Sequence, residues 1–288
     1  MIKKSNILNL LILNLLLLLA GCNSDSDEKE ENITSPISLL FSTDVRNGEE
    51  NPLLGRVNAR LHLFGKENGK VIEEEILIDN HGQGNIEHLT EGKWHISYWN
   101  IPLQGQLYLD GNDNSINVSR TGNYLNEPAP FYAGVSDFNY IPDKPVYLKL
   151  KPQTGVLTIV LILDDTTDLP KTISGVLSGI ASKRVFEAQG MNVSEQGIGS
   201  VSYSFTPNSS SVYVASHRLL GISNTRKCEL VFSDDNFSQI KIDLTAKLEA
   251  FNNLTTNNTL CMVHIYGKKL GVTIEVIDWE ERNLEIDI

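Results

Sequence analysis

The sequence predicts an all-β fold, and three observations lead to that prediction. Apolar and polar residues alternate along most of the chain after Ser35, and clusters of Gly, Asn, Asp and Pro separate the alternating stretches. Such alternation places one face of a strand on a core and the other in water, as in antiparallel sheets. Good helix formers gather in one stretch, Leu244–Asn252, which fits a connection between strands equally well. Many short strands without helices between them predict β-sandwiches rather than βαβ units.

The alternating pattern predicts strands along the whole chain from Ile37 onward. In chain order they are Ile37–Thr43, Val57–Phe64, Lys70–Ile78, Lys93–Trp99, Gln106–Leu109, Val146–Leu150, Gly155–Leu163, Val201–Phe205, Ser211–Ala215, Cys228–Phe232, Gln239–Leu244, Leu260–Tyr266 and Val272–Trp279. In the fourth of these, Trp94, Ile96 and Tyr98 fall on one face, whereas Trp99 falls on the other. We therefore expect Trp94, Ile96 and Tyr98 to share a core.

A break near residue 150 divides the chain into two predicted domains. Tyr140–Pro145 contains two prolines, and Lys149–Gly155 then leads into the most apolar predicted strand, Val156–Leu163. Division at this point gives an N-terminal β-sandwich over residues 35–149 and a C-terminal one over residues 150–288. Both have the usual size of a domain.

The first 21 residues have the composition of a secretory signal peptide. Lys3 and Lys4 supply a positive start, and Ile7–Ala20 is an apolar run shorter than the ~20 residues that a spanning helix needs. We therefore expect residues 1–21 to be removed during export.

The end of this leader, Leu19–Cys22, resembles the lipobox of bacterial lipoproteins, in which small residues precede a cysteine whose sulfur receives a diacylglycerol. We accordingly predict lipid attachment at Cys22, with palmitate-type acyl chains. Each buried acyl methylene contributes about 0.8 kcal/mol, so two or three chains give a lasting membrane anchor. The alternative is an ordinary signal peptide followed by an incidental cysteine.

An acidic segment follows the predicted lipid site. Residues 23–32 hold five acids, one base and no bulky apolar side chain, so they cannot form a core of their own. We expect residues 22–34 to be a solvated tether. Acidic residues directly after the lipid cysteine also resemble the surface-export signal of Bacteroidales-type lipoproteins.

Composition and charge exclude several classes of protein. Hydrophobic residues make up 41% of the chain, which is too many for intrinsic disorder, and one long apolar run is too few for a multi-pass membrane protein. The 24 basic and 36 acidic residues give a net charge of −12. Because a chain of this charge repels phosphate backbones, we expect no nucleic-acid partner.

Sequence motifs for catalysis and for metal binding are missing. The chain has no His-Glu-x-x-His, no Gly-x-Ser-x-Gly, no Walker sequence and no dinucleotide fingerprint, so we expect no enzyme activity, no catalytic residue and no cofactor. His81 and His88 alone approach metal-ligand spacing, and they lie in a Gly-rich region typical of turns. Asp110–Asn114 begins like a calcium loop but lacks its glycine and closing glutamate, which favours a connection between strands. Gly197–Gly199 indicates a turn.

Two cysteines remain after the predicted lipid site. Cys228 and Cys261 each lie in a predicted strand, and in an exported protein they could form a disulfide worth about 2–4 kcal/mol. The alternative, which we favour slightly, is two reduced cysteines that pack as small apolar residues. Neither lies beside an evident base, so neither is predicted to be a nucleophile.

Three places in the chain carry a resemblance to a known family. They are Val57–Phe64 with the turn at Glu67–Lys70, the strand within Leu89–Asn100, and Leu150–Asp164 with Ile173–Ser182 after it. In these places the chain resembles the Bacteroidales-type fimbrillins, above all their lipoprotein minor or anchoring subunits of FimB type. The lipobox and the acidic tether agree with the anchor-type members.

The resemblance implies two transthyretin-like β-sandwich domains in tandem and a role in surface fimbriae. Stalk subunits of that family are exported as lipoproteins, clipped after an arginine in the first strand, and polymerised by strand donation. Removal of an edge strand leaves unpaired backbone groups that a strand of another subunit can fill. Arg46 is the candidate clipping point here, with Arg56 and Arg60 as further candidates. The alternative is that all three are ordinary exposed arginines.

Two hypotheses for function follow. The first is a lipid-anchored protein of the cell outer membrane, exposed at the surface, that acts as a structural, anchoring or adhesive fimbrial subunit with other subunits as partners. The second is a surface lipoprotein that binds glycans. It requires an exposed aromatic residue such as Trp99, Tyr98 or Tyr132, and the alternative is that these side chains pack in the core.

Overall fold

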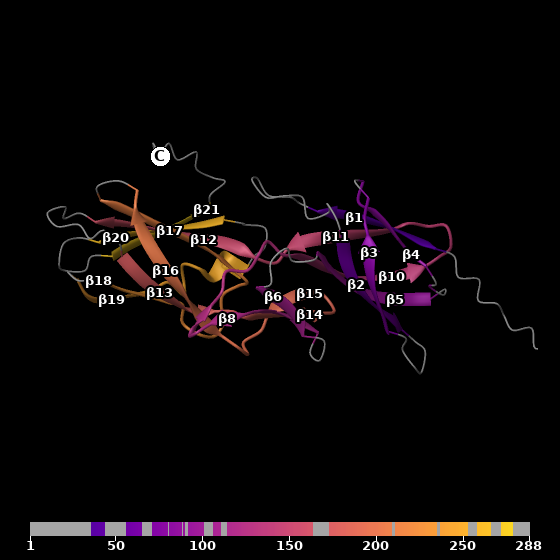
Figure 1. Cartoon of the computed structure of the whole chain (residues 1–288), viewed down its shortest axis with the longest axis horizontal. Helices are drawn as coiled ribbons and strands as arrows, with labels where there is room; N and C mark the ends of the chain where they lie inside the picture. The colour runs from indigo at the N-terminus through magenta and orange to yellow at the C-terminus, as the bar shows by residue number, and fades with distance from the viewer. Residues whose placement is uncertain are drawn as a thin grey trace, which may run out of the picture. The chain divides into compact units, whose positions relative to one another are not determined.

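The computed structural model of the chain confirms the all-β class. It describes residues 36–43, 56–64, 71–79, 81–87, 89, 92–100, 106–110, 114–163, 173–208, 211–234, 237–252, 258–265 and 272–278. Within these ranges the regular structure is β-strand, apart from one single-turn 3₁₀ helix, η1 (Glu249–Asn252). Figure 1 shows the arrangement of the strands. No helix in the part of the chain that the structure describes has the length and apolar composition needed to cross a bilayer.

The strands form two large sheets and two small ones. The first large sheet has the order β3 (Val71–Leu77), β2 (Arg56–Phe64), β5 (Gly92–Asn100), β10 (Tyr132–Tyr140), β11 (Val146–Pro152), β1 (Ile37–Thr43) and β4 (Gln83–Ile86). The second has the order β19 (Phe237–Asp243), β18 (Glu229–Asp234), β13 (Ile173–Ile180), β16 (Gly199–Pro207), β17 (Val212–Leu219), β12 (Gly155–Leu163), β20 (Asn258–Ile265) and β21 (Val272–Asp278). The small sheets consist of β15 (Gly190–Val193), β14 (Lys183–Glu187), β7 (Ser115–Val118) and β6 (Leu107–Asp110), and of β8 (Arg120–Thr121) with β9 (Tyr124–Leu125).

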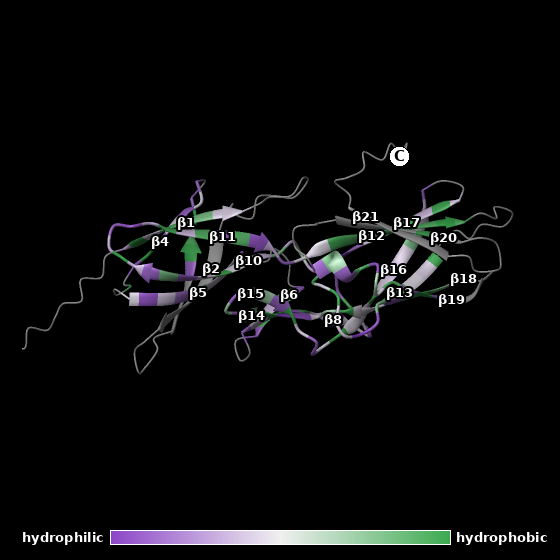
Figure 2. Ribbon diagram, turned by 180° about the vertical axis from the view of Figure 1, so that it is seen from behind, coloured by the Kyte–Doolittle hydropathy of each residue, from purple (hydrophilic) through white to green (hydrophobic). Residues whose placement is uncertain are grey.

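Every stretch predicted as a strand from its alternation is a strand in the structure, with its ends shifted by a few residues. Figure 2 shows the alternation as bands of hydrophobic and hydrophilic residues along the strands. For Leu244–Asn252 the sequence allowed either a helix or a connection between strands. In the structure it is part of the connection from β19 to β20, and it ends in η1. Asp110 and Ser115 pair at the β6–β7 hairpin, so the predicted strand connection at Asp110–Asn114 is confirmed. Gly197 has φ +81° before β16, as expected of a turn.

The alternation missed several strands, and β10 shows why. Its sequence mixes small and polar residues, yet it pairs with β5 from Ala133 to Tyr140. Gly134 of β10 lies opposite Tyr98 of β5, and a β-carbon at Gly134 would come within 2.4 Å of the Tyr98 ring. A residue with low strand propensity is therefore required here by a partner strand far away in the sequence. The other strands that the alternation missed are β4, β7, β8, β9, β13, β14 and β15.

A first core lies against the first large sheet. Trp94, Ile96 and Tyr98 are all buried in it, as their shared face predicts. The Tyr98 ring meets Phe41 of β1 edge to face, with ring centroids 5.8 Å apart. Its hydroxyl donates to Lys149 O (3.0 Å) and accepts from Lys149 N (3.1 Å), which ties β5 to β11 through the core. Burial raises the pKa of Tyr98 to about 12.

A second core lies against the second large sheet and also receives residues that precede it in the chain. Trp99 belongs to this core, with its ring centroid 5.3 Å from that of Phe186. Strand β7 pairs with β14, so residues on both sides of position 149 share one small sheet. Two separate cores with two large sheets fit tandem β-sandwiches. The transthyretin-like topology and the boundary at 149/150 stay predictions.

Candidate functional site

Strand β1 is the strand that precedes the candidate clipping point Arg46, so the predicted strand donation concerns this strand. Its residues Leu39–Thr43 pair in parallel with Val146–Leu150 of β11, and Ile37–Leu40 pair antiparallel with β4. The Phe41 N–H also donates to Gly82 O (2.8 Å). The backbone of β1 is thus hydrogen-bonded on both edges, and its removal would leave β11 with an unpaired edge.

The inward side of β1 is anchored in the first core. Ile37, Leu39 and Phe41 alternate along the strand and are all buried. Burial of a large apolar side chain contributes about 1.5–3 kcal/mol, so these three residues hold the strand firmly while it is in place. A strand that replaced β1 would need apolar residues at the same alternate positions.

Strand β4 pairs with β1 and also packs closely against β3. Gly84 pairs with Leu39, and a β-carbon at Gly84 would come within 2.5 Å of Ile76 Cγ2. The turn before β4 is held by Asp79, whose Oδ1 accepts the backbone N–H groups of His81 and Gln83, both at 2.8 Å. These two bonds lower the pKa of Asp79. The hydrogen bonds of Asp79 therefore hold the turn that leads into the short edge strand β4.

His81 and His88 are the two histidines whose spacing approaches that of metal ligands, and the structure describes the first of them. His81 is exposed in the turn held by Asp79, and His88 lies outside the described residues. Within the described ranges no group of three or more His, Cys, Asp or Glu side chains could hold a metal ion.

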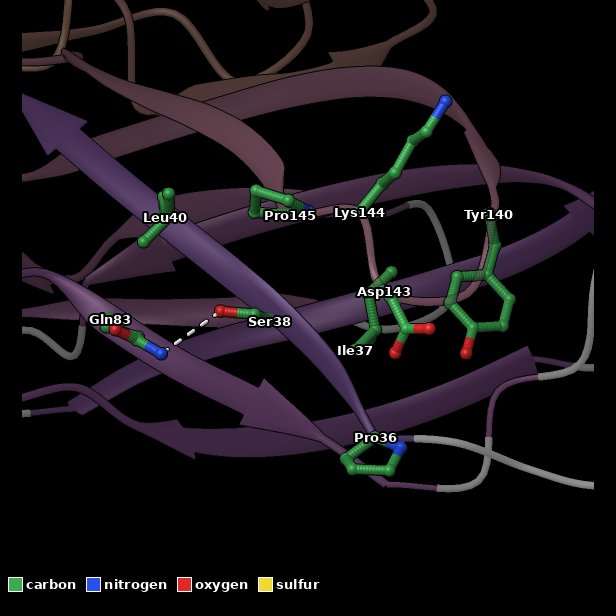
Figure 3. A pocket seen from close by; sticks show the side chains of 9 residues that line it. All are labelled: Pro36, Ile37, Ser38, Leu40, Gln83, Tyr140, Asp143, Lys144 and Pro145. Carbon is green, nitrogen blue, oxygen red and sulfur yellow. Dashed lines mark hydrogen bonds between the residues drawn. The ribbon is translucent and has the colours of Figure 1, made fainter.

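A pocket of about 370 Å³ lies beside β1 (Figure 3). The residues that line it are Pro36, Ile37, Ser38, Leu40, Gln83, Tyr140, Asp143, Lys144 and Pro145. On one side Gln83 Nε2 donates to Ser38 Oγ (3.2 Å). On the other side lies the turn between β10 and β11, where the Lys144 N–H donates to Ile141 O (3.2 Å) and Asp143 has φ +63°. Three segments distant in the sequence therefore meet at this pocket.

The aromatic residues that the sequence offered for glycan binding are not on the surface. Trp99, Tyr98 and Tyr132 are 7%, 2% and 1% exposed, so none of them offers the exposed aromatic platform that the glycan hypothesis requires, and the alternative, that they pack in the core, is confirmed. Trp99 packs in the second core, and Tyr98 and Tyr132 pack in the first. Tyr147 of β11 is instead 75% exposed. The alternation of β11 puts Tyr147 on the same outward face as Lys149, and this signal was available in the sequence.

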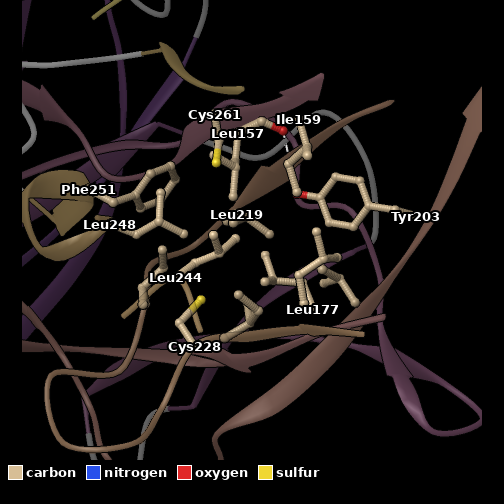
Figure 4. Packing of buried hydrophobic residues seen from close by; sticks show 14 of the residues in the cluster. Leu157, Ile159, Leu177, Tyr203, Leu219, Cys228, Leu244, Leu248, Phe251 and Cys261 are labelled. Atoms are coloured by element: carbon tan, nitrogen blue, oxygen red, sulfur yellow. Dashed lines mark hydrogen bonds between the residues drawn. The ribbon is translucent and has the colours of Figure 1, made fainter. Parts of the chain in front are cut away.

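The two cysteines of the predicted strands are buried in the second core and free (Figure 4). Burial raises the pKa of both thiols to about 12. Because the thiolate is the reactive form, Cys228 and Cys261 are held in their unreactive state. Around them lie Leu244, Leu248 and Phe251, which come from the connection between β19 and β20.

Arg184 of β14 is a buried cation that no local pattern of residues predicts. It is 3% exposed, and its Nε donates to Leu220 O (2.6 Å) while its Nη1 donates to Gln153 Oε1 (3.3 Å) and to Met191 O (3.4 Å). The Gln153 amide donates in turn to Ala133 O (3.3 Å). Burial lowers the pKa of Arg184 to about 10. The arginine thus joins the residues after β11 to the second core.

Two predicted sites lie outside the described residues. These are Cys22, the predicted lipid site, and Arg46, the candidate clipping point. Both stay predictions. Arg56 and Arg60 lie in β2, which pairs with β3 and β5.

No protein-family model and no curated protein sequence matches the chain. Solved structures do share its fold. The fimbrial anchor protein Mfa2 from Porphyromonas gingivalis has a TM-score of 0.61 and 12% identity, over 85% of this chain and 98% of that one. A candidate polysaccharide-binding protein from Bacteroides thetaiotaomicron has a TM-score of 0.60 and 12% identity, over 85% and 96%. A candidate adhesin from Bacteroides ovatus has a TM-score of 0.60 and 13% identity, over 85% and 95%. The resemblance to the fimbrillins is thereby confirmed at the level of the fold.

Proposed function

We propose that this protein is a lipid-anchored surface protein of the outer membrane that acts as a structural, anchoring or adhesive fimbrial subunit. The observation that carries the proposal is the shared fold with a fimbrial anchor protein, which extends over nearly the whole of that chain. The lipobox-like segment Leu19–Cys22 and the acidic residues after it support the anchor. An anchoring subunit needs a stable membrane attachment and a folded body that holds other subunits, and the chain has candidates for both.

The lipid anchor is tested at Cys22. Cells that express the protein are labelled with an alkyne analogue of palmitate, and the full chain is compared with its Cys22→Ser variant. We expect label on the wild-type protein and none on the variant, which should leave the membrane fraction, because two or three acyl chains are needed for lasting attachment. Equal label on both proteins would contradict attachment at this residue.

Surface exposure is tested on the same cells. A protease that cannot cross the outer membrane should digest the wild-type protein on intact cells. Digestion only after the cells are broken would contradict surface display. A periplasmic protein followed in parallel shows whether the cells stayed intact.

Strand addition is the means of assembly that we propose for the body of the protein. Strand β1 is the first strand of the described residues, lies next to an edge strand, and fills alternate core positions with Ile37, Leu39 and Phe41. Arg46 follows the end of β1 along the chain, so cleavage there would separate β1 and the lipid from the rest. An uncleaved chain keeps them joined, as an anchoring subunit requires, whereas a cleaved chain offers a groove to the strand of another subunit.

An arginine-specific protease distinguishes these two outcomes. The processed protein, purified in detergent, is treated with the protease, and its new N-terminus and its size in solution are measured. Cleavage after Arg46 followed by polymers indicates a stalk role, whereas a resistant monomer that restores fimbriae in a deletion strain indicates an anchor. The Arg46→Ala variant should resist cleavage, and the exposed Arg226→Ala should not change it. Unchanged fimbriae after deletion of the gene, together with an inert monomer, would contradict assembly altogether.

Glycan binding is the second candidate function. A similar solved structure is described as a candidate polysaccharide-binding protein, and the present chain has a pocket beside β1 with an exposed tyrosine near it. Because Trp99, Tyr98 and Tyr132 are buried, glycan binding would have to use other residues.

A further inference from the structure

The outer face of three neighbouring strands, β4, β1 and β11, has an unusual composition. Its outward-facing side chains are Gln83 and Asn85 of β4, Ser38, Leu40 and Ser42 of β1, and Tyr147, Lys149 and Lys151 of β11. The pairing places Gln83, Leu40 and Tyr147 in one row across the strands. An amide, an aliphatic side chain and an aromatic ring therefore lie side by side on one surface. We call it the β1 outer face.

Tyr147 is the most exposed large apolar residue on this face. It is the second residue of β11 and is 75% exposed, although its strand partner Leu40 is half-buried. An aromatic ring with a free face and a neighbouring aliphatic side chain offers a flat apolar platform. The C–H face of a pyranose ring has the matching shape and polarity.

The pocket of about 370 Å³ adjoins this platform through Leu40 and Pro145 (Figure 3). Pro145 precedes Tyr147 by two residues, and Leu40 is the strand partner of Tyr147. The volume falls in the range of small-ligand sites. Gln83 Nε2 is already bonded to Ser38 Oγ, which orients the amide oxygen and the serine hydroxyl as partners for ligand hydroxyls. Asp143 adds an acceptor and Lys144 a donor.

The charge on the β1 outer face is opposite to that of the whole protein. Its outward-facing side chains include two lysines, Lys149 and Lys151, and its one neighbouring carboxylate along β4 is the exposed Glu87, directly after the strand, whereas the chain has a net charge of −12. Lys144 adds a third positive charge at the pocket, where Asp143 is next to it. Local positive charge of this kind attracts anionic ligands at distances within the Debye length of about 8 Å.

We propose that the β1 outer face binds an acidic glycan, a chain of pyranose units that carry carboxylate or sulfate groups. One pyranose ring stacks on Tyr147, hydroxyl groups of the next unit enter the pocket at Ser38 and Gln83, and the anionic groups meet Lys144 and Lys149. The proposal rests on the second candidate function, glycan binding, and not on the fimbrial role, because no residue in it takes part in lipid attachment or in filling the first core.

Direct binding measurements test the site. The processed protein, purified in detergent, is titrated by calorimetry with oligogalacturonate, with chondroitin sulfate and with neutral dextran oligomers. We expect binding of at least one acidic probe and none of dextran. The Tyr147→Ala variant should lose about tenfold in affinity, and Lys144→Gln with Lys149→Gln about fivefold, with a weaker salt dependence.

Tyr108→Ala is the matched control, since Tyr108 is another exposed tyrosine, on strand β6. It should leave the affinity unchanged. Because Tyr147 is exposed, its variant should keep the wild-type melting temperature, which separates a lost ligand contact from a lost fold. Failure of both acidic probes to bind, an unchanged affinity in Tyr147→Ala, or equal binding of dextran would each overturn the proposal. None of these results would affect the palmitate labelling at Cys22.

Discussion

Strands β1 and β12 hold matching places in the two large sheets. β1 lies between a parallel partner, β11, and an antiparallel one, β4; β12 lies between its parallel partner β20 and its antiparallel partner β17. Both bury alternate side chains in a core. The partners differ, however. β4 has 4 residues and forms the edge of its sheet, whereas β17 and β20 have 8 residues each and lie inside theirs.

Because of this difference, β1 is better suited than β12 to be exchanged for a strand of another subunit. On the β4 side β1 is paired only over Ile37–Leu40, and it precedes every other strand of its sheet along the chain. Detachment of β1 would also separate the edge strand β4 from the first sheet, and we expect it to leave the second core intact. Detachment of β12 would divide the second sheet in the middle. Elements that move in assembly come from the less stable parts of a fold, and β1 meets that condition better than β12.

The largest expected effect comes from a charge placed in each strand. Leu39 of β1 and Leu157 of β12 are both fully buried, and an unpaired carboxylate in an apolar core costs several kcal/mol, a large part of the total stability of a domain. We expect Leu157→Asp to unfold the second core. Leu39→Asp should release β1 and leave residues 155–163 protected from hydrogen exchange.

Hydrogen exchange followed by mass spectrometry measures both strands in one experiment. Leu40→Asp is the matched control in β1, because Leu40 faces outward and should tolerate the change. Loss of protection in β12 when Leu39 is changed would show that the two strands unfold together. This result would contradict the claim that β1 can detach on its own.

A smaller effect is expected at Arg184, which ties the residues after β11 to the second core. Arg184→Met leaves Leu220 O and Gln153 Oε1 without their donor, and buried groups left in this way cost about 1–3 kcal/mol each. We expect a lower denaturation midpoint for the second core, with the exchange of β1 unchanged. Arg184→Lys keeps a charge and should lose less. An unchanged midpoint in Arg184→Met would show that the buried cation stabilises nothing.

The smallest effect is a dependence of the second core on alkaline pH. Burial raises the pKa of Cys228 and Cys261 to about 12, whereas thiols of an unfolded chain ionise near pH 8.5. Above that pH the unfolded state binds fewer protons than the folded state, so stability falls as the pH rises. In the first core Tyr98, with a pKa of about 12, begins to contribute only above about pH 10.

We therefore expect the second core to weaken before the first between about pH 8.5 and pH 10. Denaturant midpoints measured across this range for the wild-type protein and for Cys228→Ala with Cys261→Ala check this expectation. The double variant should show a flatter dependence on pH. Equal slopes would show that the thiols do not contribute.

Local pattern was enough to predict part of the candidate site. The alternation of Ile37, Leu39 and Phe41 predicted both the strand β1 and its buried face, and the alternation of β11 holds Tyr147 on its outward face. The pocket could not be predicted, because Ser38, Gln83 and Lys144 come from three segments that only the sheet order brings together. The same is true of Arg184, whose partners are backbone and amide oxygens from distant segments.

Strand identity, the all-β class and the apolar faces are properties of a few consecutive residues, since a period of two is present wherever a strand has one buried side. The leader and the candidate lipid site are likewise readable from consecutive residues. The tertiary structure decided which strands are neighbours, why Gly134 must lack a side chain opposite Tyr98, and why Trp99 is buried while Tyr147 is exposed. The physical reason is that burial depends on what covers a face, and long-range pairing, unlike alternation, leaves no local trace in the sequence.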